Sequence, residues 1–193
     1  MVSETVAVLE SRPGYDYEII LVNDGSPDAT MALIREICST YQRVRGIDLS
    51  RNFGQACAMM AGYNMVTGDI IVHSDDDGQT PTDHVWNLID KLQEGYDAVF
   101  AKFEEKKNSA FQNFGTWANN IMAEVLIGKP RGLHLGNFWV CKRFVIDQIC
   151  TCQNPYPYIG GLFVKATLNF GIVSTPHRPR MHGKSTYTFR KML

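Results

Sequence analysis

The residues best suited to chemistry form an acidic turn, Ser74-Asp75-Asp76-Asp77-Gly78-Gln79, directly after the expected strand Asp69-Ile70-Ile71-Val72-His73. Three adjacent carboxylates repel one another, and a bound cation relieves that repulsion. Asp75 and Asp77 are two positions apart and can point into one pocket while Asp76 turns away. Such oxygen ligands suit Mg²⁺ or Mn²⁺, particularly where a substrate phosphate completes the coordination. The alternative is a solvated turn that caps the next helix, but its place after a buried strand favours a metal site.

A second polar cluster lies near the end of the sequence, in His177-Arg178-Pro179-Arg180-Met181-His182-Gly183-Lys184-Ser185-Thr186-Tyr187. Arginine side chains match phosphate oxygens in a fork geometry, and glycine lets the backbone approach a ligand closely. Taken alone, the segment is more simply interpreted as a basic surface loop than as a phosphate site. Together with an acidic metal turn, it would neutralise a nucleotide diphosphate from the opposite side.

Two further turns follow apolar runs: Asn23-Asp24-Gly25-Ser26, and Arg51-Asn52-Phe53-Gly54-Gln55. Arg51 and Asn52 either contact a nucleotide or cap the following helix, and the residues alone do not decide between these roles. His73 lies inside an apolar strand and is expected to be a packed core residue. Trp86 and Trp117 are expected on the inner faces of helices, and Trp139 faces either the core or an acceptor cleft.

The elements that position these turns alternate between strand and helix. Buried strands are expected at 18–23, 44–49, 69–73, 97–101, 136–142 and 171–177, with helices at 26–41, 55–66, 80–92, 110–127 and after the turn 156–161. The segment Ser26-Pro27-Asp28 has the residues of a helix start. Alternation at this spacing predicts an α/β fold with a mostly parallel sheet, in which ligands bind beyond the carboxyl ends of the strands. We expect one domain over 1–193, with a nucleotide-binding half (1–101) and an elaborated acceptor and diphosphate half (102–193).

Composition narrows the class of protein. The chain has 193 residues, 45% of them hydrophobic and 20% charged, which is typical of a globular domain. A net charge of −1 provides no overall field to attract nucleic acid. No apolar run approaches the roughly 18 residues that span a bilayer, and the first residues lack the pattern of a signal peptide. We therefore expect a soluble, cytoplasmic protein whose five cysteines are reduced and mostly buried.

Taken in order, these segments resemble family 2 glycosyltransferases of the GT-A fold. The resemblance rests on Tyr17–Ser26, Leu49–Gln55, Gly68–Gln79, and the spacing Arg180-x-x-Gly183-x-Ser185-x-Tyr187. It is strongest to the branch that transfers sugars to dolichyl and undecaprenyl phosphate. The blocks cover nearly the whole chain at normal spacing.

The resemblance implies a role for particular residues. Asp24 contacts the nucleotide base or ribose, while Asp75 and Asp77 form the DxD pair with Asp77 as the more direct ligand of Mg²⁺ or Mn²⁺. Gln79 matches a glutamine usual at that place, and Arg180 and Ser185 hold the donor diphosphate or the acceptor phosphate. The expected sites are catalytic Asp77, Gln79 and Arg180; donor-binding Asp24, Gly25, Arg51, Asn52, Asp75, Asp76, Arg178 and Ser185; and acceptor-side Asn137 and Tyr187.

The sequence departs from the family pattern in three places. Relatives usually open with a strand and a turn that line the base pocket, whereas this sequence begins in what would be the following helix, so we expect that strand to be absent. Asn137 stands where many relatives carry an acid that can serve as a base. Relatives also continue into amphipathic or membrane-spanning helices beyond the position of Leu193. We therefore expect a trimmed or partial form, whose longer form associates with the membrane surface at its inner face.

The implied reaction is transfer of a sugar, with inversion, from a nucleotide sugar (UDP-sugar is favoured) to a polyprenyl phosphate. Transfer to a saccharide hydroxyl in polysaccharide synthesis is the alternative acceptor, and a nucleotide-binding fragment without activity is the alternative role. A phosphoreceiver-like regulatory domain also places aspartates at strand ends. The long second half and the Arg, Ser and Tyr cluster argue against that class.

Overall fold

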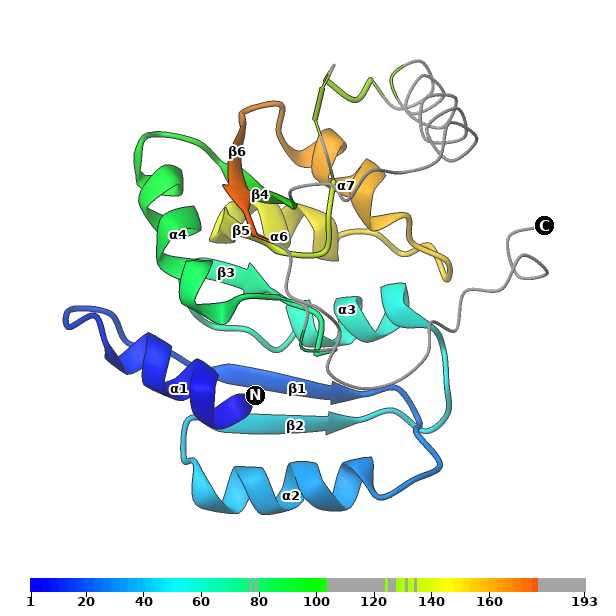
Figure 1. The fold of residues 1–193 in the computed structure, drawn as a ribbon. Helices are drawn as coiled ribbons and strands as arrows, with labels where there is room; N and C mark the ends of the chain where they lie inside the picture. Colours follow the sequence, from blue (N-terminus) through cyan, green and yellow to red (C-terminus); the bar gives the residue numbers. More distant parts are fainter. Residues whose placement is uncertain are drawn as a thin grey trace, which may run out of the picture.

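The computed structural model describes residues 1–76, 78, 80–103, 124, 128–130, 132, 133 and 135–176. The helix expected at 110–127 and the basic segment at 177–187 therefore lie outside the described residues, apart from Glu124, which is helical. Within the described part, helices and strands alternate along the chain as expected (Figure 1).

The elements follow one another in the order α1 (Val2–Glu10), β1 (Ile19–Asn23), α2 (Thr30–Thr40), β2 (Val44–Asp48), α3 (Gln55–Tyr63), β3 (Ile70–His73), a 3₁₀ turn η1 (Thr82–His84), α4 (Val85–Gln93), β4 (Ala98–Phe103), β5 (Trp139–Lys142), α6 (Arg143–Cys150), α7 (Ile159–Ala166) and β6 (Phe170–Thr175). The first strand described, β1, follows helix α1.

The strands of the described residues form two sheets. β1 and β2 pair in parallel, while the second sheet has the order β3-β5-β4-β6. In that sheet β4 and β6 are parallel, but β5 is antiparallel to both of its neighbours. The α/β class is confirmed, and β5 is the described strand that departs from parallel order.

The four-stranded sheet is covered on both faces. Val99, Ala101 and Val140 point to α4 and form one core with Leu88 and Leu92. Alternate residues of the same strands point to the other face, where Phe100, Trp139 and Cys141 pack with residues of α6 and with Phe163 of α7. This two-sided burial explains why residues 98–101 of β4 are all apolar.

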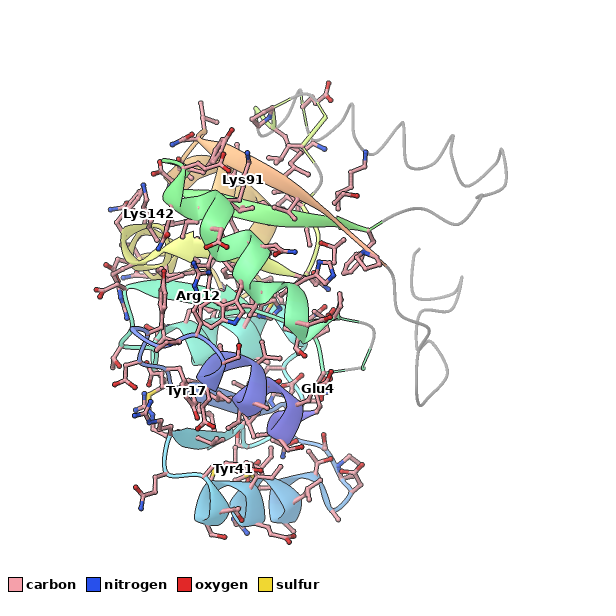
Figure 2. The ribbon with its side chains drawn as sticks, turned by 60° about the vertical axis from the view of Figure 1, so that its left-hand side comes forward. Glu4, Arg12, Tyr17, Tyr41, Lys91 and Lys142 are labelled. Carbon is pink, nitrogen blue, oxygen red and sulfur yellow. The ribbon has the colours of Figure 1, made fainter. Side chains whose placement is uncertain are left out.

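Helix α1 is fixed to the outer side of α4. The indole Nε1–H of Trp86 donates to the carbonyl of Val8 at 2.9 Å. Arg12, labelled in Figure 2, pairs with Asp90 at 2.6 Å, and its guanidinium lies 5.2 Å from the Trp86 ring centroid. These contacts join an early helix to the second sheet, and they hold α1 in place independently of β1.

β1 and β3 form the facing edges of the two sheets and run in the same direction, but they do not pair with each other (Figure 1). The amide of Ile19 donates to Arg43, so by alternation Ile20 and Val22 direct their backbone groups away from β2. The Arg143 amide donates to Asp69, so Ile70 and Val72 direct theirs away from β5. No described residue pairs with either of these edges.

These facing edges make a testable prediction about backbone protection. In hydrogen–deuterium exchange, the amides of Ile20, Val22, Ile70 and Val72 should exchange about tenfold or more faster than the inward amides of Leu21 and Ile71, because only the latter have ladder partners. Residue-resolved NMR measures both sets in one sample, so the inward amides serve as the internal control. Equal protection of the two sets would show that the edges are bonded in solution.

Two local expectations were wrong. α2 begins at Thr30 rather than at Ser26, and no side chain caps it. The Asp28 carboxylate accepts the Thr30 amide at 3.0 Å, which makes 26–29 a turn ahead of the helix rather than its first turn. The strand expected at 136–142 is also shorter, because Gly136 and Asn137 remain in the loop before β5. That difference brings Asn137 into the site.

Candidate functional site

The carboxyl ends of β1, β2 and β3 lie at one edge of the molecule, the right-hand side in Figure 1. The amino end of β5 lies there too, because β5 runs antiparallel to β3 and pairs Trp139 with His73. α3 begins at the same edge, since it follows β2. Polar residues from four separate parts of the chain are thereby brought together.

Asp24, directly after β1, binds the turn that precedes α3. Its two carboxylate oxygens accept the backbone amides of Phe53 and Gly54 at 2.7 and 2.9 Å. Gly25 makes this approach possible: it has φ +63°, and a Cβ on it would lie 2.3 Å from the Arg51 carbonyl carbon. Asp24 and Gly25 therefore fix the position of residues 51–54, a role that sequence reasoning did not assign to them.

A part-buried hydrogen bond between side chains supports the same region. The side-chain amide of Asn23 donates to the Asp48 carboxylate at 2.8 Å, and Asn23 is buried. The Asn23 side-chain oxygen in turn accepts the Ser26 amide at 3.2 Å. The ends of β1 and β2 are thus joined by side chains as well as by the backbone ladder.

Asp75, two residues after β3, is held by amides from two other elements. Gln55, the first residue of α3, donates from Nε2 to Asp75 Oδ1 at 3.0 Å. Asn137, in the loop before β5, donates from Nδ2 to Asp75 Oδ2 at 2.9 Å. Asp75 is half-buried and its neighbour Asp76 is exposed, as the alternation of the acidic turn predicts.

Three aromatic rings pack together close to Asp75, at the end of β3. The His73 ring stacks on Trp139 with centroids 5.3 Å apart, and Tyr63 meets both rings edge-on. The His73 Nε2 lies 3.9 Å from Asp75 Oδ1, too far for a hydrogen bond, and has no hydrogen-bond partner among the described residues. Burial lowers the pKa of His73 to about 4 and raises that of Tyr63. His73 is therefore a neutral packing residue, as the sequence favoured, and Trp139 belongs to the core, which the sequence left open.

Arg51 and Asn52 are exposed on the turn before α3. The Arg51 guanidinium lies 4.7 Å from the ring centroid of Phe53, which is itself 43% exposed. This stacking holds a cation at the same edge as Asp24 and Asp75. The structure thus brings together the expected residues Asp24, Gly25, Arg51, Asn52, Asp75, Asp76 and Asn137.

Asp77, Gln79, Arg178, Arg180, Ser185 and Tyr187 lie outside the described residues, so the convergence of the acidic turn with the basic segment stays a prediction. Among the residues that the structure describes, no group of three or more His, Cys, Asp or Glu side chains is arranged to hold a metal ion. Asp75 supplies one well-oriented carboxylate of the expected DxD pair.

Gln55 is the contact that sequence reasoning missed. It stands within the motif Leu49–Gln55 but carries no charge, so nothing singled it out as a partner of Asp75. The available signal was its position: the first residue of a helix that starts at the carboxyl edge of the sheet lies near residues that follow the other strands.

The Gly25 geometry can be tested by substitution. Gly25→Ala should lower the free energy of unfolding by about 1–2 kcal/mol more than Gly14→Ala, because both positions have positive φ but only Gly25 meets another backbone segment. Chemical denaturation monitored by tryptophan fluorescence provides the comparison. Equal losses in the two variants would mean that the turn before α3 moves aside without cost.

The neutral His73 predicts an acid-sensitive stability. Its pKa is about 4 in the folded protein and about 6.5 in an unfolded chain. Above about pH 6.5 the histidine is neutral in both states and does not reduce the free energy of unfolding. As the pH falls towards 4, protonation of His73 in the unfolded chain lowers this free energy by up to roughly 3 kcal/mol. His73→Phe keeps a stacked ring without a titrating nitrogen, so its unfolding free energy should fall less steeply between pH 7 and 4.

The half-buried His84, at the start of α4, provides the control for this measurement. His84→Phe should retain the acid dependence of the parent chain, because His73 is still present. An unchanged slope in His73→Phe would assign the acid sensitivity to other groups.

Comparison with solved structures identifies the class of fold. The chain superposes on glucosyl-3-phosphoglycerate synthase from Mycobacterium tuberculosis in complex with phosphoglyceric acid with a TM-score of 0.65 and 20% identity, over 94% of this chain and 67% of that one. The same enzyme in complex with Mn²⁺, uridine diphosphate and glucosyl-3-phosphoglycerate gives a TM-score of 0.63 at 22% identity, over 92% and 67% of the two chains. The fold is that of the GT-A glycosyltransferases.

The family follows from the sequence itself. Residues 1–150 match the family described as "Glycosyl transferase family 2". The chain belongs to this family, which confirms the resemblance of its motifs.

Two curated relatives are each named undecaprenyl-phosphate 4-deoxy-4-formamido-L-arabinose transferase. The one from Proteus mirabilis (strain HI4320) is 30% identical over 92% of this chain and 55% of its own length. The one from Klebsiella pneumoniae (strain 342) is 29% identical over 93% and 55%. The chain therefore spans about half the length of these relatives. Among its described helices, none is both long and apolar enough to cross a membrane.

Proposed function

We propose that this chain carries the donor-binding part of a metal-dependent, inverting glycosyltransferase that moves a sugar from a UDP-sugar to a polyprenyl phosphate. The observation that carries the proposal is the Asp75 carboxylate at the carboxyl end of β3, oriented by Gln55 and Asn137. Through Gln55, Asp75 is joined to the turn that carries Arg51 and binds Asp24. The carboxyl ends of the strands are where open α/β sheets bind their ligands.

The chemistry of Asp75 fits a hard divalent cation. Its oxygens are anionic, half-buried and oriented by neutral amides, which suits Mg²⁺ or Mn²⁺. Asp75 and Asp77 would hold the ion, and when bound it would stabilise negative charge on the donor diphosphate. The Mn²⁺ and uridine diphosphate named with the structural neighbour support this choice of metal and donor.

The reaction is a single displacement at the anomeric carbon. An acceptor oxygen forms a bond to that carbon as the bond to the donor phosphate oxygen breaks, and the bonding pair leaves with the nucleoside diphosphate. The barrier depends mainly on charge that develops on the leaving group. Arg178 and Arg180 are proposed to stabilise this charge, with Gln79 and Ser185 beside the diphosphate and Asp24, Gly25, Arg51, Asn52 and Asp76 on the donor side.

A phosphate acceptor is favoured because it needs no general base. The second pKa of a phosphate monoester is about 6, so its attacking oxygen is already ionised near neutral pH. A saccharide hydroxyl would instead require a base, and the amide of Asn137 cannot serve as one. The names of the curated relatives, which include undecaprenyl phosphate, support the same acceptor. Tyr187 is proposed on the acceptor side, and a longer form of the protein is proposed to meet the lipid at the inner face of the membrane.

The proposal is tested first at the donor. UDP should bind the parent chain more tightly with Mn²⁺ than without it, as measured by isothermal titration calorimetry. Asp75→Ala should abolish this metal-dependent gain, a loss larger than the roughly 10- to 100-fold expected when only an outer partner of a metal ligand is removed. Asp147→Ala removes an exposed carboxylate on α6 and should bind UDP and Mn²⁺ like the parent.

The acceptor is tested separately, by incubating radiolabelled UDP-sugars with undecaprenyl phosphate or with a soluble oligosaccharide. Label in the lipid fraction alone supports the proposed acceptor, and label in the oligosaccharide supports transfer to a hydroxyl. Donor binding without transfer to either would identify a nucleotide-binding part that requires the rest of a longer protein. A parent chain whose affinity for UDP is unaffected by Mn²⁺ or Mg²⁺ would contradict the metal-dependent mechanism.

A further inference from the structure

We infer that Asn137 and Gln55 are positioning residues of the donor site, which fix the Asp75 carboxylate in the orientation that binds the donor metal. This inference rests on the proposed function. It also moves Asn137 from the acceptor side, where the sequence places it, to the donor side. Each amide holds a different oxygen of the same carboxylate, at 2.9 Å from Asn137 and 3.0 Å from Gln55.

The orientation of both amides follows from charge. An ionised carboxylate has acceptor sites only, so each side chain must turn its NH₂ group, and not its oxygen, towards Asp75. Two donors on opposite oxygens restrict rotation of the carboxylate about its terminal torsion. A carboxylate has about four lone-pair sites, so these two bonds do not exhaust its capacity to bind a cation.

Both side-chain amides belong to residues whose backbone is fixed by neighbouring contacts. Gln55 begins α3 directly after Gly54, whose backbone amide is bound by Asp24. Asn137 stands two residues before Trp139, which is 1% exposed and pairs in register with His73 of β3. Asp75 is thus fixed relative to both sheets: Gln55 links it to the region of β1 and β2, and Asn137 links it to β5.

A neutral partner suits this place better than a charged one. A second carboxylate at position 137 would lie about as close to Asp75 as the amide does, and like charges at such distances favour protonation of one of them. An amide orients Asp75 without competing for the cation and without changing the net charge of the site. This accounts for an asparagine at position 137 without any role in proton transfer.

The acceptor-side and donor-side roles of Asn137 give different results when no acceptor is present. We would titrate UDP with Mn²⁺ into Asn137→Leu and Gln55→Leu by calorimetry, and measure Mn²⁺ binding alone by electron paramagnetic resonance. Both variants should weaken metal-dependent UDP binding roughly 10-fold, the usual cost of losing an outer partner of a metal ligand. UDP binding without metal should not change.

Asn87→Ala, an exposed asparagine on α4, is the matched control and should bind like the parent. Gln55 is exposed, so Gln55→Leu keeps the test decisive even if Asn137→Leu folds poorly. Parent-like binding of Mn²⁺ and UDP in Gln55→Leu would overturn the role of Gln55, and the same result in a folded Asn137→Leu would overturn that of Asn137. The loss in Asp75→Ala would leave the proposed function standing in both cases. Absence of metal-dependent UDP binding in the parent would overturn both.

Discussion

The arrangement of the site depends on the first turn of α3 and the residues just before it. The amides of Phe53 and Gly54 bind Asp24, which follows β1, while the side chain of Gln55 binds Asp75, which follows β3. The two sheets do not pair with each other, so these hydrogen bonds connect them at the edge where ligands are expected. The geometry of the donor site is therefore coupled to the position of one helix end.

The aromatic cluster next to Asp75 makes the site rigid and adds no charge to it. His73, Tyr63 and Trp139 pack ring against ring directly below the acidic turn. Because burial keeps His73 neutral near pH 7, the layer adds no charge under Asp75. A close-packed aromatic layer has few alternative rotamers, so the residues that follow β3 leave the sheet in a defined direction.

The sequence was sufficient to predict the α/β class, the strand positions and the edge at which the polar turns gather, because these follow from hydrophobic periodicity and the rules of parallel sheets. It also predicted that Asp75 turns inward and Asp76 outward. The partners of Asp75 were not predictable in this way. Gln55 and Asn137 are uncharged and far from Asp75 in sequence, and their meeting depends on the register of β5 with β3. Periodicity predicts that a strand exists, but it does not predict its direction.

The start of α2 was mistaken for a related reason. Ser26-Pro27-Asp28 has the residue types of a helix start, but those types also suit a turn, and here Asp28 accepts the amide of Thr30 ahead of the helix. The requirement for glycine at position 25 is evident only from the structure. A side chain there would collide with the backbone of Arg51 and Asn52. These residues are distant from Gly25 in the sequence, so no local pattern predicts the requirement.

The reversed direction of β5 has a consequence for how such a protein can diversify. β4 ends and β5 begins at the same edge, the one that carries Asp24 and Asp75, so the connection between Phe103 and Trp139 departs from that edge and returns to it. The register of β4 with β5 is set by the paired residues of the two strands, so the length and sequence of this connection can vary while the sheet keeps its order.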